Sequence, residues 1–397
     1  MINVHGTLLS KKWIAALCVI LIIAGVAARV SFINADAPQD ISISAAIYTD
    51  EGFKTYSPRN RVLFGDWKWT PEDEYRSWVN SSPVATASYT WIFNNFGVSF
   101  LTIRSLSIFY GIMTVLLLFL FMFSCYDLST ALAGTAFFSA NFFVIMFNRL
   151  GLYETHLVFY SVLALFLVYF SWRVLHRLSR KGKSFNIPFR LSHVLVAAIM
   201  FSFALAAMIT GFYIKKSITL ILVSLFPAII LSIMALSQKT DRKRTSMFTL
   251  IMGLMVIGYF LFAHLSFLHS SLDSFFNLRV MGVKIDSILP LRSLAPIYVL
   301  AGKGMYREFV FLQPVILFLA FYYAVYTFYR FSYREEKASV DLYLSSWFFF
   351  GFVLLMMLQY NPARYFLMLS VPAAILASRG LHALAAGAFS EFRKSQR

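Results

Sequence analysis

Residues 98–124 read VSFLTIRSLSIFYGIMTVLLLFLFMFS, and this stretch decides the class of fold. An α-helix needs about 20 consecutive, mostly apolar residues to cross the hydrocarbon core of a bilayer. The stretch reaches that length, and from Gly111 to Phe123 only one of its residues, Thr114, has a polar side chain. We therefore expect these residues to form a membrane-spanning helix.

Nine further apolar segments of similar length recur along the chain. They lie near 13–33, 129–147, 155–172, 191–212, 218–236, 247–267, 308–328, 342–359 and 364–385. The composition agrees, since 59% of the residues are hydrophobic and only 13% are charged, against about 25% charged in soluble domains. The sequence predicts an all-α polytopic membrane protein with about ten transmembrane helices and a large first outer loop that carries interfacial helices.

One segment leaves the number of spans open. Residues 288–302 are apolar but contain two prolines and an arginine, so we interpret them as a re-entrant or interfacial segment, or as an eleventh span. We divide the chain into a first transmembrane module, residues 1–236, which includes an outer loop at 35–97. Residues 237–397 are expected to form the C-terminal transmembrane helices, with a second outer loop at 268–307.

The distribution of lysine and arginine predicts the orientation. Loop 173–190 has six basic residues and no acid, and loop 239–244 has four basic residues and one acid. Such loops stay on the cytoplasmic side of a membrane. Both termini are then inside, and loop 35–97, with eight of the eighteen acids, faces the periplasm or the exterior. This fits an integral protein of a bacterial inner membrane. The net charge of +17 indicates anionic lipid rather than nucleic acid as its partner.

The first outer loop contains a pair of adjacent acids, Asp50 and Glu51, followed by the basic and aromatic stretch 56–67, YSPRNRVLFGDW. A carboxylate beside a second acid and screened from water has a raised pKa and can act as a general base. The pair would suit deprotonation of an acceptor next to a lipid-linked substrate. The alternative is a purely structural pair, a helix N-cap followed by a first-turn acid.

Several cations gather on the same outer side. Arg149 and Glu154 lie in loop 148–154, Lys216 and Arg279 lie in later loops, and Arg364 lies in loop 361–366. Guanidinium groups donate parallel hydrogen bonds that match a phosphate. These residues therefore predict a site for an anionic group, although each cation alone is also explained by contact with lipid head groups.

Four of these stretches together resemble a known family. They are Asp50-Glu51, Gly65-Asp66-Trp67, Asn148–Thr155 and Asn361–Leu367. In order, spacing and sidedness they are similar to the membrane-embedded C-type glycosyltransferases of the protein mannosyltransferase and aminoarabinose transferase type. The resemblance covers about residues 10–235 and returns at 360–375. The chain departs from the family at Ser81-Ser82-Pro83, where members often have His-Pro-Pro, so substrate contacts there are expected to differ.

The resemblance implies an inverting transfer of a hexose or pentose from a polyprenyl-phosphate donor to an acceptor hydroxyl on the outer face. Asp50 would be the base, and Glu51 would hold the helix turn or contact the sugar. Arg149 and Arg364 would stabilise the leaving phosphate, with Arg279 and Lys216 as secondary candidates. Four further residues are candidates for sugar or acceptor contact: Glu154, Tyr56, Arg59 and Trp67. Glu154 would alternatively orient Arg149.

Other functions remain possible at this point. A transporter or flippase for lipid-linked saccharides usually has ionisable residues within its spans and internal repeats, whereas the spans here are almost free of charge and no repeat is evident. A ligase of lipid-linked glycans would be expected to have one long late loop, but the longest loop is the first. The two cysteines, Cys18 and Cys125, and the histidines show no metal-ligand spacing, so metal dependence stays open. The sugar and the acceptor, whether lipid, glycan or protein, also stay open.

Overall fold

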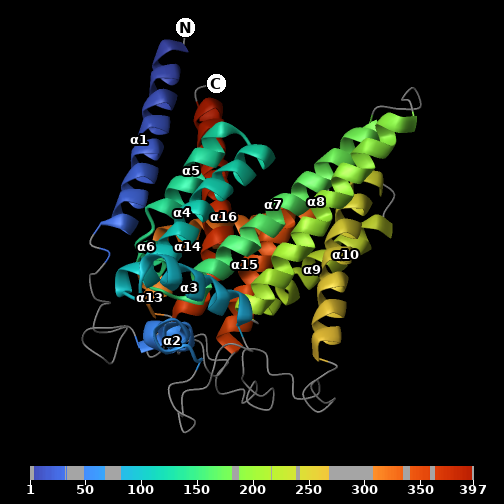
Figure 1. The fold of residues 1–397 in the computed structure, drawn as a ribbon. Coiled ribbons are helices and arrows are strands. Elements are labelled where there is room, and N and C mark those ends of the chain that lie inside the picture. Colours follow the sequence, from blue (N-terminus) through green and yellow to red (C-terminus); the bar gives the residue numbers. More distant parts are fainter. Residues whose placement is uncertain are drawn as a thin grey trace.

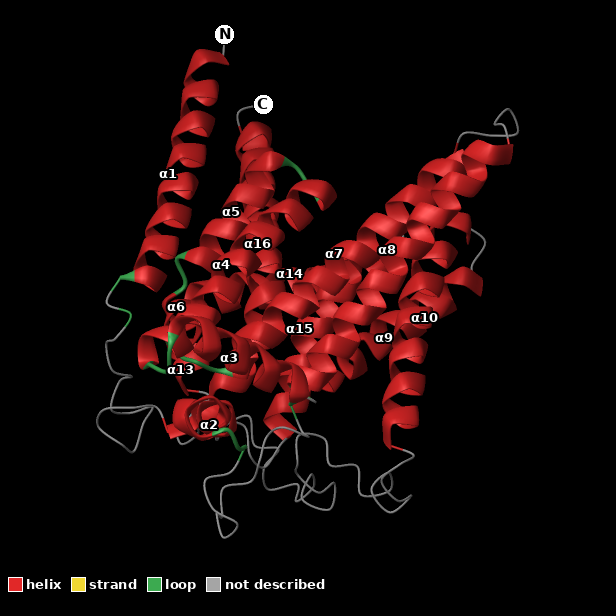
Figure 2. Cartoon of the chain, in the orientation of Figure 1, coloured by secondary structure: helices red, strands yellow, loops and turns green. Residues whose placement is uncertain are grey.

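The computed structural model describes residues 4–31, 33, 49–67, 82–180, 187–215, 217–237, 242–267, 307–333, 340–357 and 363–395. All regular elements in these ranges are helices (Figures 1 and 2). They are α1 (Val4–Val30), α2 (Thr49–Phe64), α3 (Pro83–Phe96), α4 (Phe100–Cys125), α5 (Leu128–Ser139), α6 (Phe142–Arg149), α7 (Tyr153–Arg180), α8 (Ile187–Ile214), α9 (Ile218–Ser237), α10 (Arg242–Phe267), α13 (Arg307–Phe311), α14 (Pro314–Tyr333), α15 (Val340–Met357), a 3-10 segment (Ala363–Leu369) and α16 (Ser370–Ser395).

The predicted all-α membrane fold is confirmed. Within the described residues, six helices are long and apolar enough to cross a membrane, or seven if the bent pair α5 and α6 forms one span. Three more predicted spans correspond to shorter apolar stretches, Ile218–Met234, Phe248–Phe262 and Val340–Met356. Segment 288–302 and loop 268–306 lie outside the described residues, and the division at residue 236 stays a prediction.

One predicted span, 129–147, is not a single straight helix. It consists of α5 and α6, whose axes differ by 57°. Asn141 explains the break, because its side chain accepts a hydrogen bond from the backbone N–H of Phe143 at 3.0 Å and so caps the start of α6. An asparagine cap satisfies an otherwise unpaired amide at a helix start. The last predicted span, 364–385, likewise begins as the 3-10 segment and becomes α-helical at Ser370.

The two chain ends lie at one end of the helix bundle, and the short helices α2 and α3 lie at the other (Figure 1). We call the end that carries α2 and α3 the outer end. These two helices fall within the predicted outer loop 35–97, where interfacial helices were expected. The outer end also holds the start of α7, the connection between α8 and α9, and the 3-10 segment, which bring polar side chains from three parts of the sequence close to α2.

Candidate functional site

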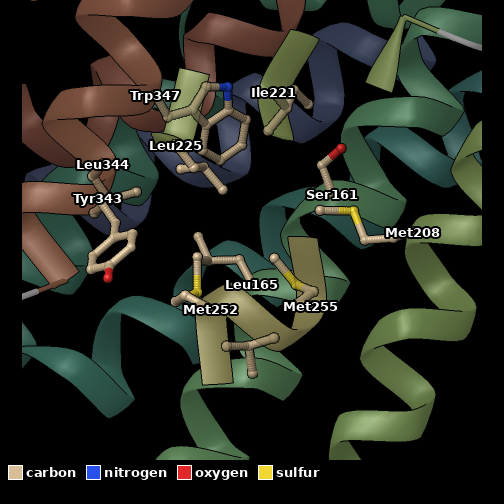
Figure 3. A pocket seen from close by; sticks show the side chains of 11 residues that line it. Ser161, Leu165, Met208, Ile221, Leu225, Met252, Met255, Tyr343, Leu344 and Trp347 are labelled. Carbon is tan, nitrogen blue, oxygen red and sulfur yellow. The ribbon is translucent and has the colours of Figure 1, made fainter. Parts of the chain in front are cut away.

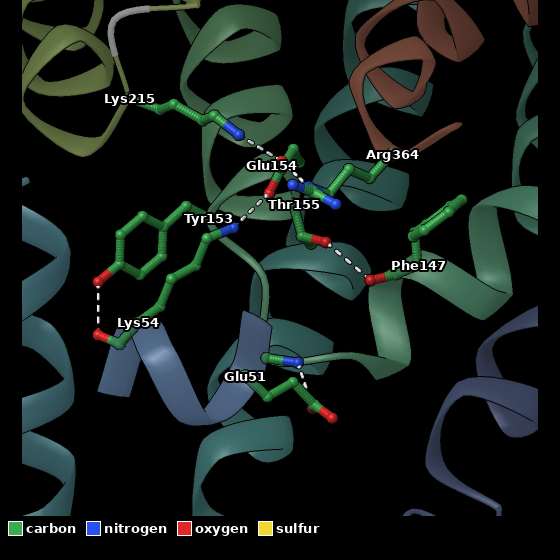
Figure 4. Close-up of polar contacts among 9 residues, drawn as sticks. Glu51, Lys54, Phe147, Tyr153, Glu154, Thr155, Lys215 and Arg364 are labelled. Carbon is green, nitrogen blue, oxygen red and sulfur yellow. Dashed lines mark hydrogen bonds and ion pairs between the residues drawn. The ribbon is translucent and has the colours of Figure 1, made fainter. Parts of the chain in front are cut away.

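A buried carboxylate holds three cations together at the outer end (Figure 4). The side chain of Glu154 is 2% exposed. Its Oε2 accepts from the ammonium of Lys54 at 3.3 Å, and its Oε1 accepts from Nε of Arg364 at 3.1 Å. The ammonium of Lys215 also donates to Oε1. We call these four residues the Glu154 cluster.

The four members come from four separate elements. Lys54 lies on α2, Glu154 in the first turn of α7, Lys215 between α8 and α9, and Arg364 in the 3-10 segment. An acid in the first turn of a helix is favoured by the helix dipole, which accounts for Glu154 at the start of α7. The cluster therefore depends on the tertiary fold, because no two of its residues are close in sequence.

Tyrosine rings line the cluster. The ammonium of Lys54 lies 5.1 Å from the ring centre of Tyr153, whose hydroxyl donates to the backbone carbonyl of Lys54 at 2.8 Å. The ammonium of Lys215 lies 4.2 Å from the ring centre of Tyr365. The electron-rich faces of these rings attract cations. The tyrosines thus help to hold both lysines in place without adding a negative charge to the cluster.

The cluster has more positive than negative charge. Three cations face one carboxylate, which leaves a formal excess of two positive charges when all four groups are ionised. The pKa of Lys215 is lowered to about 7, mainly by burial and also by the nearby charges of Lys54 and Arg364, while Glu154 opposes this shift. A second anion entering the cluster would favour the charged form of Lys215. The arrangement is therefore suited to bind an anionic group.

The second acid of the predicted pair, Glu51, is fully engaged with protein groups. Arg104 of α4 donates from Nε and Nη2 to the two carboxylate oxygens of Glu51, each at 3.0 Å. The backbone N–H of Gly151 adds a third bond to Oε1 at 2.7 Å. Both charged side chains are buried. Glu51 therefore joins α2 to α4 and to the segment before α7.

The structure describes only part of the remaining candidates for catalysis and phosphate binding. Asp50 lies in the first turn of α2, one helical turn before Lys54, and its side chain lies outside the described residues. Arg149 is the last residue of α6 and is half-buried. Lys216 and Arg279 lie outside the described residues. The expectation that Glu154 orients Arg149 differs from the contacts found, which are those with Lys54, Lys215 and Arg364.

Two of the candidates for sugar or acceptor contact, Tyr56 and Arg59, line a groove between α2 and the start of α4. Trp67 follows α2, and its ring centre lies 5.7 Å from the guanidinium of Arg61. The groove has a volume of about 630 Å³, which is within the range of small-molecule sites.

A smaller cavity lies inside the bundle among α7, α8, α9, α10 and α15 (Figure 3). Its lining is almost entirely apolar and includes Met208, Met252 and Met255. Its volume of about 20 Å³ has room for about one water molecule, and it offers no charged group for chemistry. Among the described residues, no group of three or more histidine, cysteine, aspartate or glutamate side chains is arranged to hold a metal ion.

Sequence reasoning missed three of the residues that build the site, Lys54, Lys215 and Arg104. Lys215 adjoins Lys216, and a pair of lysines gives no signal for which one points inward. Arg104 had a usable signal, because an arginine within an apolar span is rare and generally has a partner inside the protein. Lys54 lies one turn after the acidic pair, but only the fold reveals its contact with Glu154.

Comparisons with known proteins give matches in structure alone. No protein-family profile and no curated protein matches the sequence. The structure is similar to that of the Archaeoglobus fulgidus oligosaccharyltransferase in its apo form, with a TM-score of 0.56 and 13% identity over 97% of this chain and 52% of that chain. It is also similar to the same enzyme in complex with an inhibitory peptide and a dolichol-phosphate, with a TM-score of 0.54 and 12% identity over 97% and 52% of the two chains.

A third structure of that enzyme, tethered to an acceptor peptide, matches with a TM-score of 0.53 and 14% identity over 94% of this chain and 50% of that chain. The chain shares the fold of this archaeal oligosaccharyltransferase, a GT-C-type fold. This confirms the fold that the sequence resemblance implied. The narrower likeness to the mannosyltransferase and aminoarabinose transferase type stays a prediction. The chain spans about half the length of the oligosaccharyltransferase.

Proposed function

We propose that this protein is a glycosyltransferase that moves a sugar from a polyprenyl-phosphate donor to an acceptor hydroxyl. The observation that carries the proposal is the buried excess of positive charge in the Glu154 cluster, within a fold shared with a C-type glycosyltransferase. A buried charge without a counter-charge is costly, so an anionic ligand is expected to complete the cluster. The similar oligosaccharyltransferase has been captured with dolichol-phosphate, which supports a lipid phosphate as that ligand.

The cluster would stabilise the leaving group. When the bond between the anomeric carbon and the phosphate oxygen breaks, negative charge develops on the phosphate. Arg364, Lys54 and Lys215 would donate charge-assisted hydrogen bonds to it. Cations fixed in place before the reaction stabilise this charge without reorganisation during the step. We keep Arg149, Lys216 and Arg279 as further candidates for phosphate contact.

Asp50 is our proposed general base. It lies in the first turn of α2, four residues before Lys54, and residues four apart share one face of a helix. Its carboxylate would take the proton of the acceptor hydroxyl while the acceptor oxygen attacks the anomeric carbon from the side opposite the phosphate. This route inverts the configuration at that carbon. Glu51 would position α2 rather than react, because both of its oxygens bind protein groups.

The sidedness of the reaction follows from the predicted topology. The described termini lie opposite the Glu154 cluster (Figure 1), so termini in the cytoplasm would place the cluster on the periplasmic or outer side of a bacterial inner membrane. A transporter for lipid-linked saccharides is the competing proposal. It would need a path between the two ends, whereas the Glu154 cluster lies at one end and the interior cavity is small and apolar.

Transfer can be tested directly. Purified protein is incubated with radiolabelled polyprenyl-phosphate sugars and with candidate lipid, glycan and peptide acceptors, and products are separated by mobility. We expect at least one donor and acceptor pair to give product, and Asp50→Asn to lower its rate by about 10²-fold or more with unchanged protein abundance. Movement of the intact donor across a vesicle membrane, with no product from any pair, would favour the transporter instead.

A further inference from the structure

Helix α2 has two faces with different surroundings. The buried face contains Glu51, Lys54 and Pro58, and it contributes Lys54 to the Glu154 cluster. The opposite face contains Gly52, Tyr56 and Arg59, which lie at positions i, i+4 and i+7 and line the groove of about 630 Å³. Residues with this spacing form one stripe along a helix. The helix thus separates the proposed donor phosphate site from the groove.

Helix α4 forms the other wall of the groove. Val98, Ser99, Phe100 and Ile103 come from its first turns and from the segment before them. Ile103 is followed directly by Arg104, whose double bond to Glu51 fixes α4 against α2. A buried ion pair therefore holds the two walls of the groove together.

The chemistry of the groove is aromatic and cationic. Phe53 and Phe100 are 41% and 40% exposed, and together with Tyr56 they present three rings to the groove. Arg59 is the one charged residue among the described lining residues. Its Nη1 donates to the side-chain oxygen of Asn60 at 3.3 Å, and no carboxylate in the described part of the chain pairs with it. Aromatic faces carry negative charge that attracts polarised C–H groups, and a guanidinium recognises carboxylate or phosphate.

We infer that this groove binds the acceptor, and that the acceptor is a sugar ring carrying a carboxylate or phosphate group. The inference rests on the proposed function for the role of the bound sugar. The ring would stack on the aromatic residues, and its anionic group would bind Arg59. Asp50, the proposed base, lies two residues before Gly52, so the turn of α2 that carries the base also forms one end of the groove. The acceptor hydroxyl would reach the donor around the first turn of α2, where the helix begins.

Binding of three matched sugars tests the inference. Glucuronic acid, glucose 6-phosphate and glucose share a ring and differ at carbon 6, which carries a carboxylate, a phosphate or a neutral hydroxyl. Saturation-transfer NMR on the purified full chain in phosphatidylcholine nanodiscs, with polyprenyl phosphate added to fill the Glu154 cluster, measures each dissociation constant. We expect both acids to bind about tenfold more tightly than glucose. Arg59→Gln should remove this difference, and Tyr56→Ala should weaken all three sugars.

Arg61→Gln is the matched control, because Arg61 lies on α2 but is exposed and donates to the backbone carbonyl of Gly65. It should leave all three constants unchanged. The inference is overturned if glucose binds as tightly as the acids, or if Arg59→Gln keeps the preference. It is also overturned if phosphatidylglycerol in the nanodiscs competes with the acidic sugars for Arg59. The groove would then be a lipid head-group site.

The two proposals fail separately. If Arg59→Gln abolishes the preference for acids but no donor and acceptor pair gives product, the groove stands and glycosyl transfer does not. If product forms but the Arg59 variant binds and transfers to acidic and neutral acceptors equally, glycosyl transfer stands and the acceptor assignment does not.

Discussion

At the scale of single residues, the site depends on which charges are compensated. Glu51 has a matched partner in Arg104 and a third bond from Gly151, whereas Glu154 faces three cations. A compensated buried pair is suited to fix structure, and an excess charge is suited to bind a ligand. Glutamate therefore has two roles in this structure. The Glu51–Arg104 pair and the Glu154 cluster meet on α2, where Glu51 and Lys54 lie less than one turn apart.

Lys215 predicts a pH dependence of donor binding. Burial lowers its pKa to about 7, so the ammonium is charged below that pH and increasingly neutral above it. Binding of polyprenyl phosphate should therefore weaken as the pH rises through about 7. Lys215→Arg keeps its charge across the alkaline range and should flatten this decline. Equilibrium binding of a labelled polyprenyl phosphate measures both proteins, and a parent protein whose affinity stays constant across this range would contradict the role of Lys215.

Glu51→Gln separates structure from catalysis. The change removes the negative charge that Arg104 contacts with two bonds inside the protein, which should lower the free energy of unfolding by about 3 kcal/mol. Thermal unfolding of the purified protein measures the loss. Turnover per folded molecule should fall much less than in Asp50→Asn. A Glu51→Gln protein with unchanged stability and the activity loss expected for Asp50→Asn would instead make Glu51 the general base.

At the scale of elements, periodicity and length predicted where the helices are but not where they break. The apolar run 129–147 has the length of one span, and the cap at Asn141 divides it into α5 and α6. The asparagine is visible in the sequence, but asparagine within an apolar run does not by itself reveal a bend of 57°. The bend depends on tertiary contacts, such as the bond from Nε of Arg29 to the side-chain oxygen of Asn148 at 3.0 Å.

Gly151, between α6 and α7, lies where a larger side chain would clash. A Cβ on Gly151 would lie 2.1 Å from Cγ2 of Ile103, so Gly151→Ala forces Ile103 on α4 to shift. We expect a loss of about 1–3 kcal/mol in stability, measured by thermal unfolding. Gly253→Ala on α10 is the control, because nothing lies within 4 Å of its added Cβ. It should be neutral or slightly stabilising, and equal effects at both sites would contradict this packing.

At the scale of the whole molecule, the fold class followed from the sequence, and the outer location of the polar residues stays a prediction. Composition and apolar runs were sufficient to predict the fold class, and the basic loops predicted which side of the membrane the polar residues face. The partners inside the Glu154 cluster did not follow, because Lys54 and Arg364 are 310 residues apart in the chain and only packing of α2, α7 and the 3-10 segment brings them to one carboxylate. Arg364 was the exception, since the family resemblance pointed to it.

Topology predicts opposite labelling of the two ends. In a protein whose native cysteines are replaced by serine, Asn95→Cys at the exposed end of α3 should react with a membrane-impermeant maleimide from outside intact cells. Ser129→Cys, exposed at the start of α5 near the end that holds the termini (Figure 1), should react only after the membrane is opened. The reverse pattern would place the Glu154 cluster in the cytoplasm.

The central claim is that the Glu154 cluster holds the donor phosphate, and the affinity of the purified protein for bare polyprenyl phosphate tests it most directly. We predict that Arg364→Ala lowers this affinity by about tenfold or more. Arg364→Lys should lower it less, because an ammonium keeps the charge but loses the planar fork, and the exposed control Arg61→Ala should leave it unchanged. An Arg364→Ala protein that is folded and binds polyprenyl phosphate as tightly as the parent would contradict the account.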